Sequence, residues 1–324
     1  MNYKTPTKAI ITDAGFASRY LPITKTIPKA MLPLGNRPIM QLVVEECAAA
    51  GITEIIIVAT HDGKKTYEDY FTNPCLNVKS LLDRQGKSER YEPITHVLSL
   101  PKITVIEQDP SYPYGNGSPI ASAREFINDD EAFIVAYSDD VVFGSSDVKT
   151  LIDSYNQHPD AKAIIVAQEM PHEVMNKYGA ISLADNEKMT LKDIIEKSDD
   201  APTNLASYGR YLLTPEVFQH LDPQNIGKDG ELWTVDAITK MAKSGNVYVE
   251  KTRGQWMTTG DPKNYFLAHL KYVKDYEDYK QKIIRQKQLK KKTVESVKKY
   301  LEAEDIKLLE TKIEEASVQP IFKS

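Results

Sequence analysis

Residues 8–15 read Lys-Ala-Ile-Ile-Thr-Asp-Ala-Gly, a short apolar run with β-branched side chains that ends at a glycine. Such a run predicts a buried strand that leads into a turn. The next stretch, residues 15–37, holds three prolines among basic residues, which excludes a regular helix there. Residues 39–50 favour a helix that ends at Gly51, and residues 54–59 favour a second buried strand. Strand, loop, helix and strand in this order are the βαβ pattern of a parallel sheet.

The same alternation of strands and helices continues along the chain. Residues 63–100 are polar and favour helices, and residues 178–213 favour several strands with turns. Further strands are predicted at 103–107, 132–137 and 163–167, and further helices after Gly117, at 147–157 and at 231–243. We therefore expect an α/β fold with a mixed, mostly parallel sheet flanked by helices.

Composition excludes several classes of protein. The chain has 324 residues, of which 41% are hydrophobic, and 41 Lys and Arg against 46 Asp and Glu give a formal net charge of −5. This balance predicts a large core and no nucleic-acid partner. No apolar run approaches the roughly 18 residues that a membrane-spanning helix needs, so we expect no membrane partner. Cys47 and Cys75 are the only cysteines, which favours neither a disulfide framework nor a four-ligand zinc site. With a polar N-terminus as well, the sequence predicts a cytoplasmic protein.

Three residues with polar or flexible character follow directly after predicted strands. They are Gly15, Gln108 and Asp139. Ligands of open α/β sheets bind beyond the carboxyl ends of the strands, so this coincidence indicates a site. A glycine loop offers backbone N–H groups to phosphates, and Arg19 and Lys29 in the same loop could neutralise a polyphosphate. Taken alone, these residues also fit solvated loop charges.

A longer pattern is more specific. Residues 14–33 read Ala-Gly-x-x-x-Arg-x-x-Pro-x-Thr-x-x-x-Pro-Lys-x-x-Leu-Pro, which resembles the signature of the sugar-1-phosphate nucleotidylyltransferases. Later segments are similar to the bacterial UTP–glucose-1-phosphate uridylyltransferases, or UDP-glucose pyrophosphorylases, of that family. These segments are residues 38–46, 81–87, 115–117 with Gln108, 178–179, 196–197, 209–211, 236–238 and 260–262. The resemblance covers residues 8 to about 275 and implies a Rossmann-like nucleotide-diphospho-sugar transferase fold.

The resemblance implies a metal-dependent reaction. UTP and glucose 1-phosphate would give UDP-glucose and pyrophosphate, with Mg²⁺ as the cofactor. Such a transfer depends mainly on positioning and charge stabilisation, which suits the residue types present. By resemblance, Arg19, Lys29 and Lys197 are expected to be catalytic, and Asp139 is expected to bind the metal.

The resemblance also divides the remaining residues between the two substrates. The expected nucleotide-binding residues are Ala14, Gly15, Gln108 and Gly117, and the expected sugar-binding residues are Gly179, Glu196 and Lys197. Two simpler interpretations stay open at this point. Asp139 and Asp140 also fit a turn after a strand, and Glu196 with Lys197 also fits an exposed charge pair.

Four positions depart from the family pattern. Ala17 stands where the family loop has a second glycine, which would cost about 1–2 kcal/mol if φ is positive there. Thr258 stands where the family has a second metal-binding Asp, Ala30 where Glu is usual, and Trp233 where Gln is common beside the sugar. These departures favour two alternatives to an active uridylyltransferase. One is a catalytically weak regulatory paralogue that binds nucleotide sugar, and the other is a nucleotidylyltransferase for another sugar 1-phosphate or nucleotide.

The C-terminal part differs from the rest in composition. Residues 262–316 are almost free of Gly and Pro and predict two amphipathic helices, the second over 293–315. We expect a catalytic domain over 1–275 and a helical extension over 276–324. The family resemblance favours a homodimer or homotetramer, in which the extension could take part. An equally simple alternative is a pair of helices that folds back on its own core.

Overall fold

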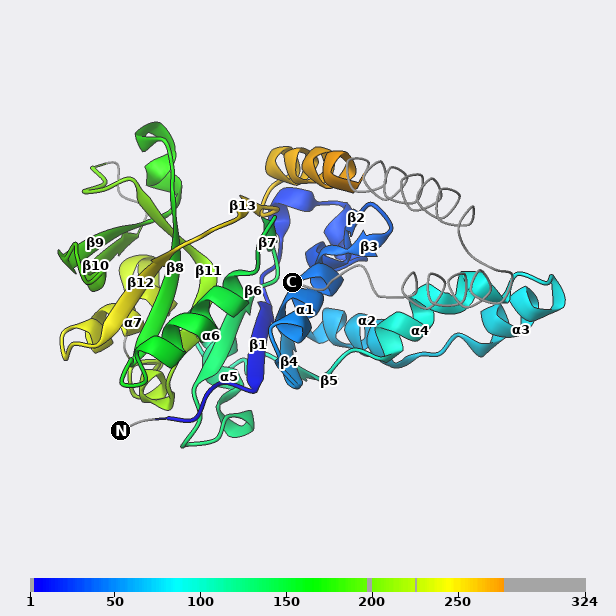
Figure 1. Ribbon diagram of the computed structural model, residues 1–324, viewed down its shortest axis with the longest axis horizontal. Helices are drawn as coiled ribbons and strands as arrows, with labels where there is room; N and C mark the ends of the chain where they lie inside the picture. Colours follow the sequence, from blue (N-terminus) through cyan, green and yellow to red (C-terminus); the bar gives the residue numbers. More distant parts are fainter. Residues whose placement is uncertain (1–2, 197–199, 225, 277–324) are drawn as a thin grey trace, which may run out of the picture. The chain divides into compact units, whose positions relative to one another are not determined.

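The structure is a computed structural model that describes residues 3–196, 200–224 and 226–276. Its main element is a nine-stranded mixed sheet (Figure 1). The strand order is β5-β4-β1-β6-β11-β8-β12-β10-β9. The strands are β1 (Lys8–Asp13), β4 (Glu54–Ala59), β5 (Lys102–Glu107), β6 (Phe133–Tyr137), β8 (Ala163–Glu169), β9 (Gly179–Asp185), β10 (Thr190–Glu196), β11 (Leu205–Leu213) and β12 (Val247–Lys251). β5, β4, β1 and β6 run parallel, and β11 runs antiparallel to both β6 and β8.

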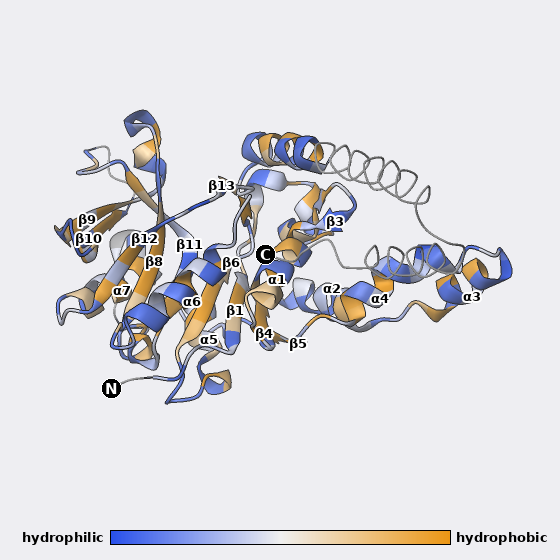
Figure 2. Cartoon of the chain, in the orientation of Figure 1, coloured by the Kyte–Doolittle hydropathy of each residue, from blue (hydrophilic) through white to orange (hydrophobic). Residues whose placement is uncertain are grey.

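Helices cover both faces of this sheet. Successive side chains of a strand point to opposite faces, and the apolar side chains on each face pack against helices. Ile10 of β1 packs in one core with α5 (Gly117–Ser122) and α7 (Thr234–Ala242). Ile11 packs in the other core with α1 (Ile39–Ala49), α2 (His61–Thr72) and α6 (Asp147–Gln157). Figure 2 shows the strands β4 and β6 as predominantly hydrophobic, in agreement with two-sided burial.

The carboxyl ends of the parallel strands are in register. Asp13 of β1 pairs with Ala59 of β4, and Ala59 pairs with Glu107 of β5. On the other side of β1, Thr12 pairs with Tyr137 of β6. The chain therefore leaves three strands at one edge of the sheet, immediately before Ala14, Gln108 and Ser138.

Shorter elements surround this edge. Two-stranded pairs are formed by β2 (Pro33–Leu34) with β3 (Arg37–Pro38) and by β7 (Asp140–Phe143) with β13 (Gln255–Thr258). The segment before Arg37 also contains the 3-10 helices η1 (Ser18–Tyr20), η2 (Ile23–Lys25) and η3 (Lys29–Met31). An insertion after α2 holds α3 (Leu76–Arg84), η4 (Ser88–Tyr91) and α4 (Glu92–Leu98). The remaining 3-10 helices are η5 (Arg124–Phe126), η6 (His172–Lys177), η7 (Pro215–Gln219) and η8 (Lys228–Gly230).

The fold class expected from the sequence is confirmed. Within the described residues the predicted strands and helices are present, with small differences in bounds, and residues 15–37 contain no α-helix. The pairing of β7 with β13 was not predicted. Within the described ranges no helix is long and apolar enough to cross a membrane.

The chain divides into two compact units, Met1–Ala268 and His269–Ser324. Residues 262–276 are helical, which agrees with the first predicted C-terminal helix. The second predicted helix, over 293–315, lies outside the described residues.

Candidate active site

The turn between β6 and β7 carries Asp139, whose carboxylate binds the ammonium group of Lys29. Nζ of Lys29 lies 2.6 Å from Oδ2 of Asp139, and the two side chains are 15% and 24% exposed. Burial alone would raise the pKa of Asp139, but the charge and hydrogen bond of Lys29, a backbone hydrogen bond and the charge of Arg210 together lower it. Burial would likewise lower the pKa of Lys29, but Asp139 and Asp13 raise it. Both groups are therefore charged at neutral pH.

The backbone of Asp139 is held from the neighbouring β13. Its carbonyl oxygen accepts hydrogen bonds from the N–H of Thr259 at 2.6 Å and from Oγ1 of Thr259 at 2.9 Å. The hydroxyl of Tyr20 in turn donates to the carbonyl oxygen of Thr259 at 2.6 Å. This arrangement fixes Asp139 relative to the loop that holds Lys29.

Thr258 faces the same space as Asp139. It pairs with Asp140 across β7 and β13, and its Oγ1 accepts a hydrogen bond from the N–H of Gly260 at 3.1 Å. A Cβ atom on Gly260 would lie 3.1 Å from Oγ1 of Thr258 and 3.2 Å from Oδ2 of Asp139. A carboxylate at position 258 would thus share a site with Asp139, and this chain has a hydroxyl there instead.

The donor set limits which cation the site can take. Among the described residues no group of three or more His, Cys, Asp and Glu could hold a metal. One carboxylate and one hydroxyl are too few to cage a cation with protein atoms alone. They fit Mg²⁺ that arrives on a triphosphate, because Mg²⁺ commonly keeps water and phosphate oxygens and takes only one or two carboxylates.

The glycine loop after β1 holds Ala14 and Gly15 and leads into η1, which carries Arg19. Ala17 has φ 47° and ψ 41°, so the left-handed conformation in which a second glycine would be favoured is present and is occupied by alanine. Oγ1 of Thr24 donates to the carbonyl oxygen of Ala17 at 3.0 Å, and Nη1 of Arg19 donates to that of Gly260 at 3.3 Å. Arg19 thus connects the loop to Gly260, the residue after Thr259, which binds the backbone of Asp139.

A second loop follows β5 and carries Gln108 and Gly117. The N–H of Gln108 donates to the carbonyl oxygen of Ala59, which continues the sheet by one residue. The N–H of Gly117 donates to the carbonyl oxygen of Leu232 at 2.8 Å, and a Cβ atom on Gly117 would lie only 2.9 Å from that oxygen. Glycine is therefore required at 117 by the close approach of residue 232.

A cavity of about 650 Å³ brings several predicted residues together. Arg19, Asp139, Gly179, Glu196 and Trp233 all line it. The other lining residues are Asn116, Tyr137, Asp140, Asn176, Lys177, Tyr178, Ser207, Tyr208, Gly209, Tyr211, Val235, Trp256, Thr258, Gly260, Asp261 and Asn264. The predicted nucleotide-binding residues are not among them, although Asn116, next to Gly117, connects their loop to the cavity.

Two of the three predicted sugar-binding residues, Gly179 and Glu196, form one edge of this cavity. Gly179 begins β9 and pairs with Glu196, the last residue of β10. A Cβ atom on Gly179 would lie 2.8 Å from Cγ2 of Ile194 and 2.9 Å from Oε2 of Glu196, so only glycine fits beside this carboxylate. Glu196 thus lines the cavity and is partly buried. Lys197 follows it directly and lies outside the described residues.

Sequence reasoning missed half of the aromatic lining. Tyr137, Tyr208 and Trp256 line the cavity, and the rings of Tyr208 and Trp256 stack with centroids 4.5 Å apart. Asp140 was expected in a capped turn as one alternative. Its carboxylate instead accepts hydrogen bonds from Nε1 of Trp256 at 2.8 Å and the N–H of Gly209 at 3.0 Å.

Comparisons with known proteins agree with this geometry. The family model described as Nucleotidyl transferase matches residues 8–275. UTP–glucose-1-phosphate uridylyltransferase 2 of Staphylococcus saprophyticus is 35% identical over 271 residues, covering 82% of this chain and 91% of that protein. UTP–glucose-1-phosphate uridylyltransferase of Bacillus subtilis is 34% identical over 283 residues, covering 86% and 94%. A crystal structure of a UDP-glucose pyrophosphorylase complexed with UDP-glucose matches with a TM-score of 0.71 at 30% identity, covering 83% of this chain and 99% of that one.

Proposed function

Because the chain belongs to the nucleotidyl transferase family, we propose that it transfers the uridylyl group of UTP to glucose 1-phosphate, giving UDP-glucose and pyrophosphate. The observation that supports this most is the cavity of about 650 Å³, in which Arg19 and Asp139 face the Gly179–Glu196 edge. A site for charged phosphates and a site for a polar sugar thus share one space.

In the proposed reaction a phosphate oxygen of glucose 1-phosphate attacks the α-phosphorus of UTP. The bond from that phosphorus to the oxygen bridging to the β-phosphorus breaks, and this oxygen leaves on pyrophosphate. Lys29 and Arg19 stabilise the negative charge that shifts to the leaving group. Asp139 would hold Mg²⁺, which would supply further neutralisation of phosphate charge.

The remaining proposed roles come from the family resemblance, and the positions of the described residues support them. Gly15 and Ala14, at the end of β1, present backbone N–H groups to the nucleotide. Gln108 can both donate to and accept from a pyrimidine edge, and Gly117 holds the following loop close against Leu232. On the sugar side, Glu196 accepts from hydroxyl groups beside Gly179, and Lys197 binds the sugar phosphate.

Two observations favour a second candidate function. Ala17 occupies a left-handed conformation, and position 258 lacks a carboxylate beside Asp139. Both weaken the triphosphate and metal site but leave the sugar edge intact. A nucleotide-sugar-binding protein with little turnover would have these features. Trp233 in the cavity wall favours, in addition, a sugar 1-phosphate other than glucose 1-phosphate.

A substrate panel tests the proposal. Purified protein is incubated with Mg²⁺, UTP or TTP, and the 1-phosphates of glucose, galactose or N-acetylglucosamine, and products are identified by mass spectrometry. UDP-glucose as the main product supports the proposed function. A different nucleotide sugar as the main product would replace it, and no product despite measurable UDP-glucose binding would favour the binding protein.

We also propose the domain organisation and the assembly. Residues 1–275 form the catalytic domain, and the helical extension 276–324 joins subunits of a homodimer or homotetramer. Light scattering on a chain that ends at residue 275 tests this. If the truncated chain still forms the same oligomer as the full chain, the extension is not part of the interface.

Two free cysteines, one of them buried, agree with a cytoplasmic location.

A further inference from the structure

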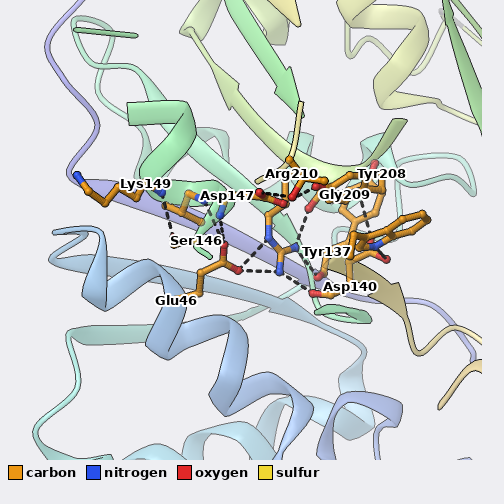
Figure 3. A network of polar contacts seen from close by, with 12 residues as sticks. Glu46, Tyr137, Asp140, Ser146, Asp147, Lys149, Tyr208, Gly209 and Arg210 are labelled. Atoms are coloured by element: carbon orange, nitrogen blue, oxygen red, sulfur yellow. Dashed lines mark hydrogen bonds and ion pairs between the residues drawn. The ribbon is translucent and has the colours of Figure 1, made fainter. Parts of the chain in front are cut away.

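Two sequence segments of the family resemblance have no role in the proposed reaction, and the structure joins them. One ends at Glu46 in α1, and the other centres on Arg210 in β11. Arg210 is 0% exposed and is among the largest fully buried side chains of the described residues. Figure 3 shows its guanidinium group between Glu46 and the turn that follows β6.

Every nitrogen of the Arg210 side chain has a partner. Nε and Nη2 donate to Oε2 of Glu46 at 3.2 and 3.1 Å. Nη1 donates to the carbonyl oxygens of Tyr137 at 3.1 Å and Gly209 at 2.8 Å. Nη2 also donates to the carbonyl oxygen of Asp140 at 2.6 Å. Arg210 therefore binds the backbone on both sides of Ser138 and Asp139.

Glu46 is itself held in place. Its Oε1 accepts hydrogen bonds from the N–H groups of Asp147 and Val148, at 2.9 and 3.1 Å, in the first turn of α6. The carboxylate thus connects α1 and α6 to the guanidinium group. Arg210 of β11 is therefore connected through Glu46 to α1 and α6, and it cannot move away from the turn without breaking these contacts.

This cluster is more elaborate than packing requires. A buried ion pair adds little stability compared with well-packed apolar side chains of similar volume, because both charges lose their hydration. What an apolar side chain could not do is bind the carbonyl oxygens of residues 137 and 140. The contacts point to control of backbone geometry around Asp139 as the use of the buried charge.

We propose that Arg210, held by Glu46, is a positioning residue that sets the Asp139 carboxylate for the divalent cation. This inference rests on the proposed function, because that function identifies UTP as the nucleotide that binds together with the cation. Its structural basis is the clamp on the Tyr137 and Asp140 carbonyl oxygens.

The test uses the full chain with Arg210→Lys and Glu46→Gln, and Glu131→Gln as the matched control. Glu131 is also buried, at 5% exposed, and accepts hydrogen bonds from the N–H of Thr7 at 2.8 Å and from Asn128 at 2.9 Å. It lies just before β6, at the end of the strand opposite to Asp139. Thermal melts monitor folding, and electron paramagnetic resonance measures Mn²⁺ affinity with UTP in the absence of sugar phosphate.

We expect Arg210→Lys to weaken Mn²⁺ binding at least tenfold, Glu46→Gln to weaken it by a smaller factor above threefold, and Glu131→Gln to leave it within twofold. Initial rates should show the same order in the Mg²⁺ concentration for half-maximal rate. Excess Mg²⁺ should restore much of kcat, while KM for glucose 1-phosphate stays near the wild-type value.

Folded Arg210→Lys protein with wild-type Mn²⁺ affinity would overturn the inference. If Arg210→Lys does not fold, Glu46→Gln decides, and an affinity within twofold of wild type would overturn it in the same way. A wild-type protein that binds Mn²⁺ with UTP but forms no UDP-glucose would refute the proposed function alone, because the Mn²⁺ titration still tests Arg210.

Discussion

Thr258→Asp should strengthen cation binding, because position 258 faces Asp139 across the space beside Gly260. A Cβ atom on Gly260 would be 3.1 Å from Oγ1 of Thr258 and 3.2 Å from Oδ2 of Asp139. An Asp at position 258 would thus bring a second carboxylate toward the same cation. The neutral Thr258→Asn, of the same size, is the matched control.

The expected increase in Mg²⁺ affinity follows from the free energy that one charge-assisted ligand contributes. Such an interaction contributes about 1.5–3 kcal/mol. Since about 1.4 kcal/mol corresponds to a factor of ten, Thr258→Asp should improve Mg²⁺ affinity roughly ten- to a hundredfold. Without metal, the added charge lies near Asp139 and Asp140, of which only Asp139 is paired with Lys29. The variant should therefore melt at a lower temperature than wild type in EDTA.

Pyrophosphate release at limiting Mg²⁺ is the assay. Thr258→Asp should reach half-maximal rate at a tenfold or greater lower Mg²⁺ concentration, and Mg²⁺ should raise its Tm more than it raises that of wild type. Thr258→Asn should do neither. If the Asp variant has the Mg²⁺ dependence of wild type, Thr258 does not stand at a metal-binding position, and the reasoning from the β7–β13 pair is wrong.

Three further expectations concern other parts of the described chain. Gly179→Ala should raise KM for glucose 1-phosphate about tenfold or more with little change in KM for UTP, because a methyl group there would lie 2.9 Å from Oε2 of Glu196; equal changes in both constants would contradict the placement of the sugar edge. Ala17→Gly should raise stability by up to about 1 kcal/mol in denaturant unfolding, since it removes left-handed strain at φ 47° while freeing the unfolded chain, and a clear loss would contradict it. A thiol reagent should modify Cys75 but not Cys47 in native protein, because Cys47 is fully buried and burial raises its pKa to about 12; rapid reaction of both thiols would refute the predicted core.

The edge of the sheet that holds the site could be predicted from sequence. Gly15, Gln108 and Asp139 each follow an apolar run, and parallel strands end at a common edge. The register of Asp13, Ala59 and Glu107 shows that these ends are aligned. Local patterns were sufficient because each strand is decided by its own few residues.

Contacts across the sequence could not be predicted in the same way. Lys29 and Asp139 are 110 positions apart, and their ion pair depends on the pairing of β7 with β13, which lies beside the turn that carries Asp139. Those strands are four residues each, and β13 has no clear period. Arg210 was noticed in a motif, but a charged residue in a nine-residue strand gave no signal that it is completely buried. Its role depends on Glu46, which only the tertiary fold brings near.

Pyrophosphate release from UTP and glucose 1-phosphate with Mg²⁺ tests the proposed activity most directly. The protein concentration must be high enough to detect a rate about a thousandfold below a typical kcat of about 10 s⁻¹. We predict steady release with wild-type protein that disappears with Asp139→Ala, with UDP-glucose formed in equal amount. No release by wild-type protein that binds UTP, or undiminished release by Asp139→Ala, would contradict the account of this site.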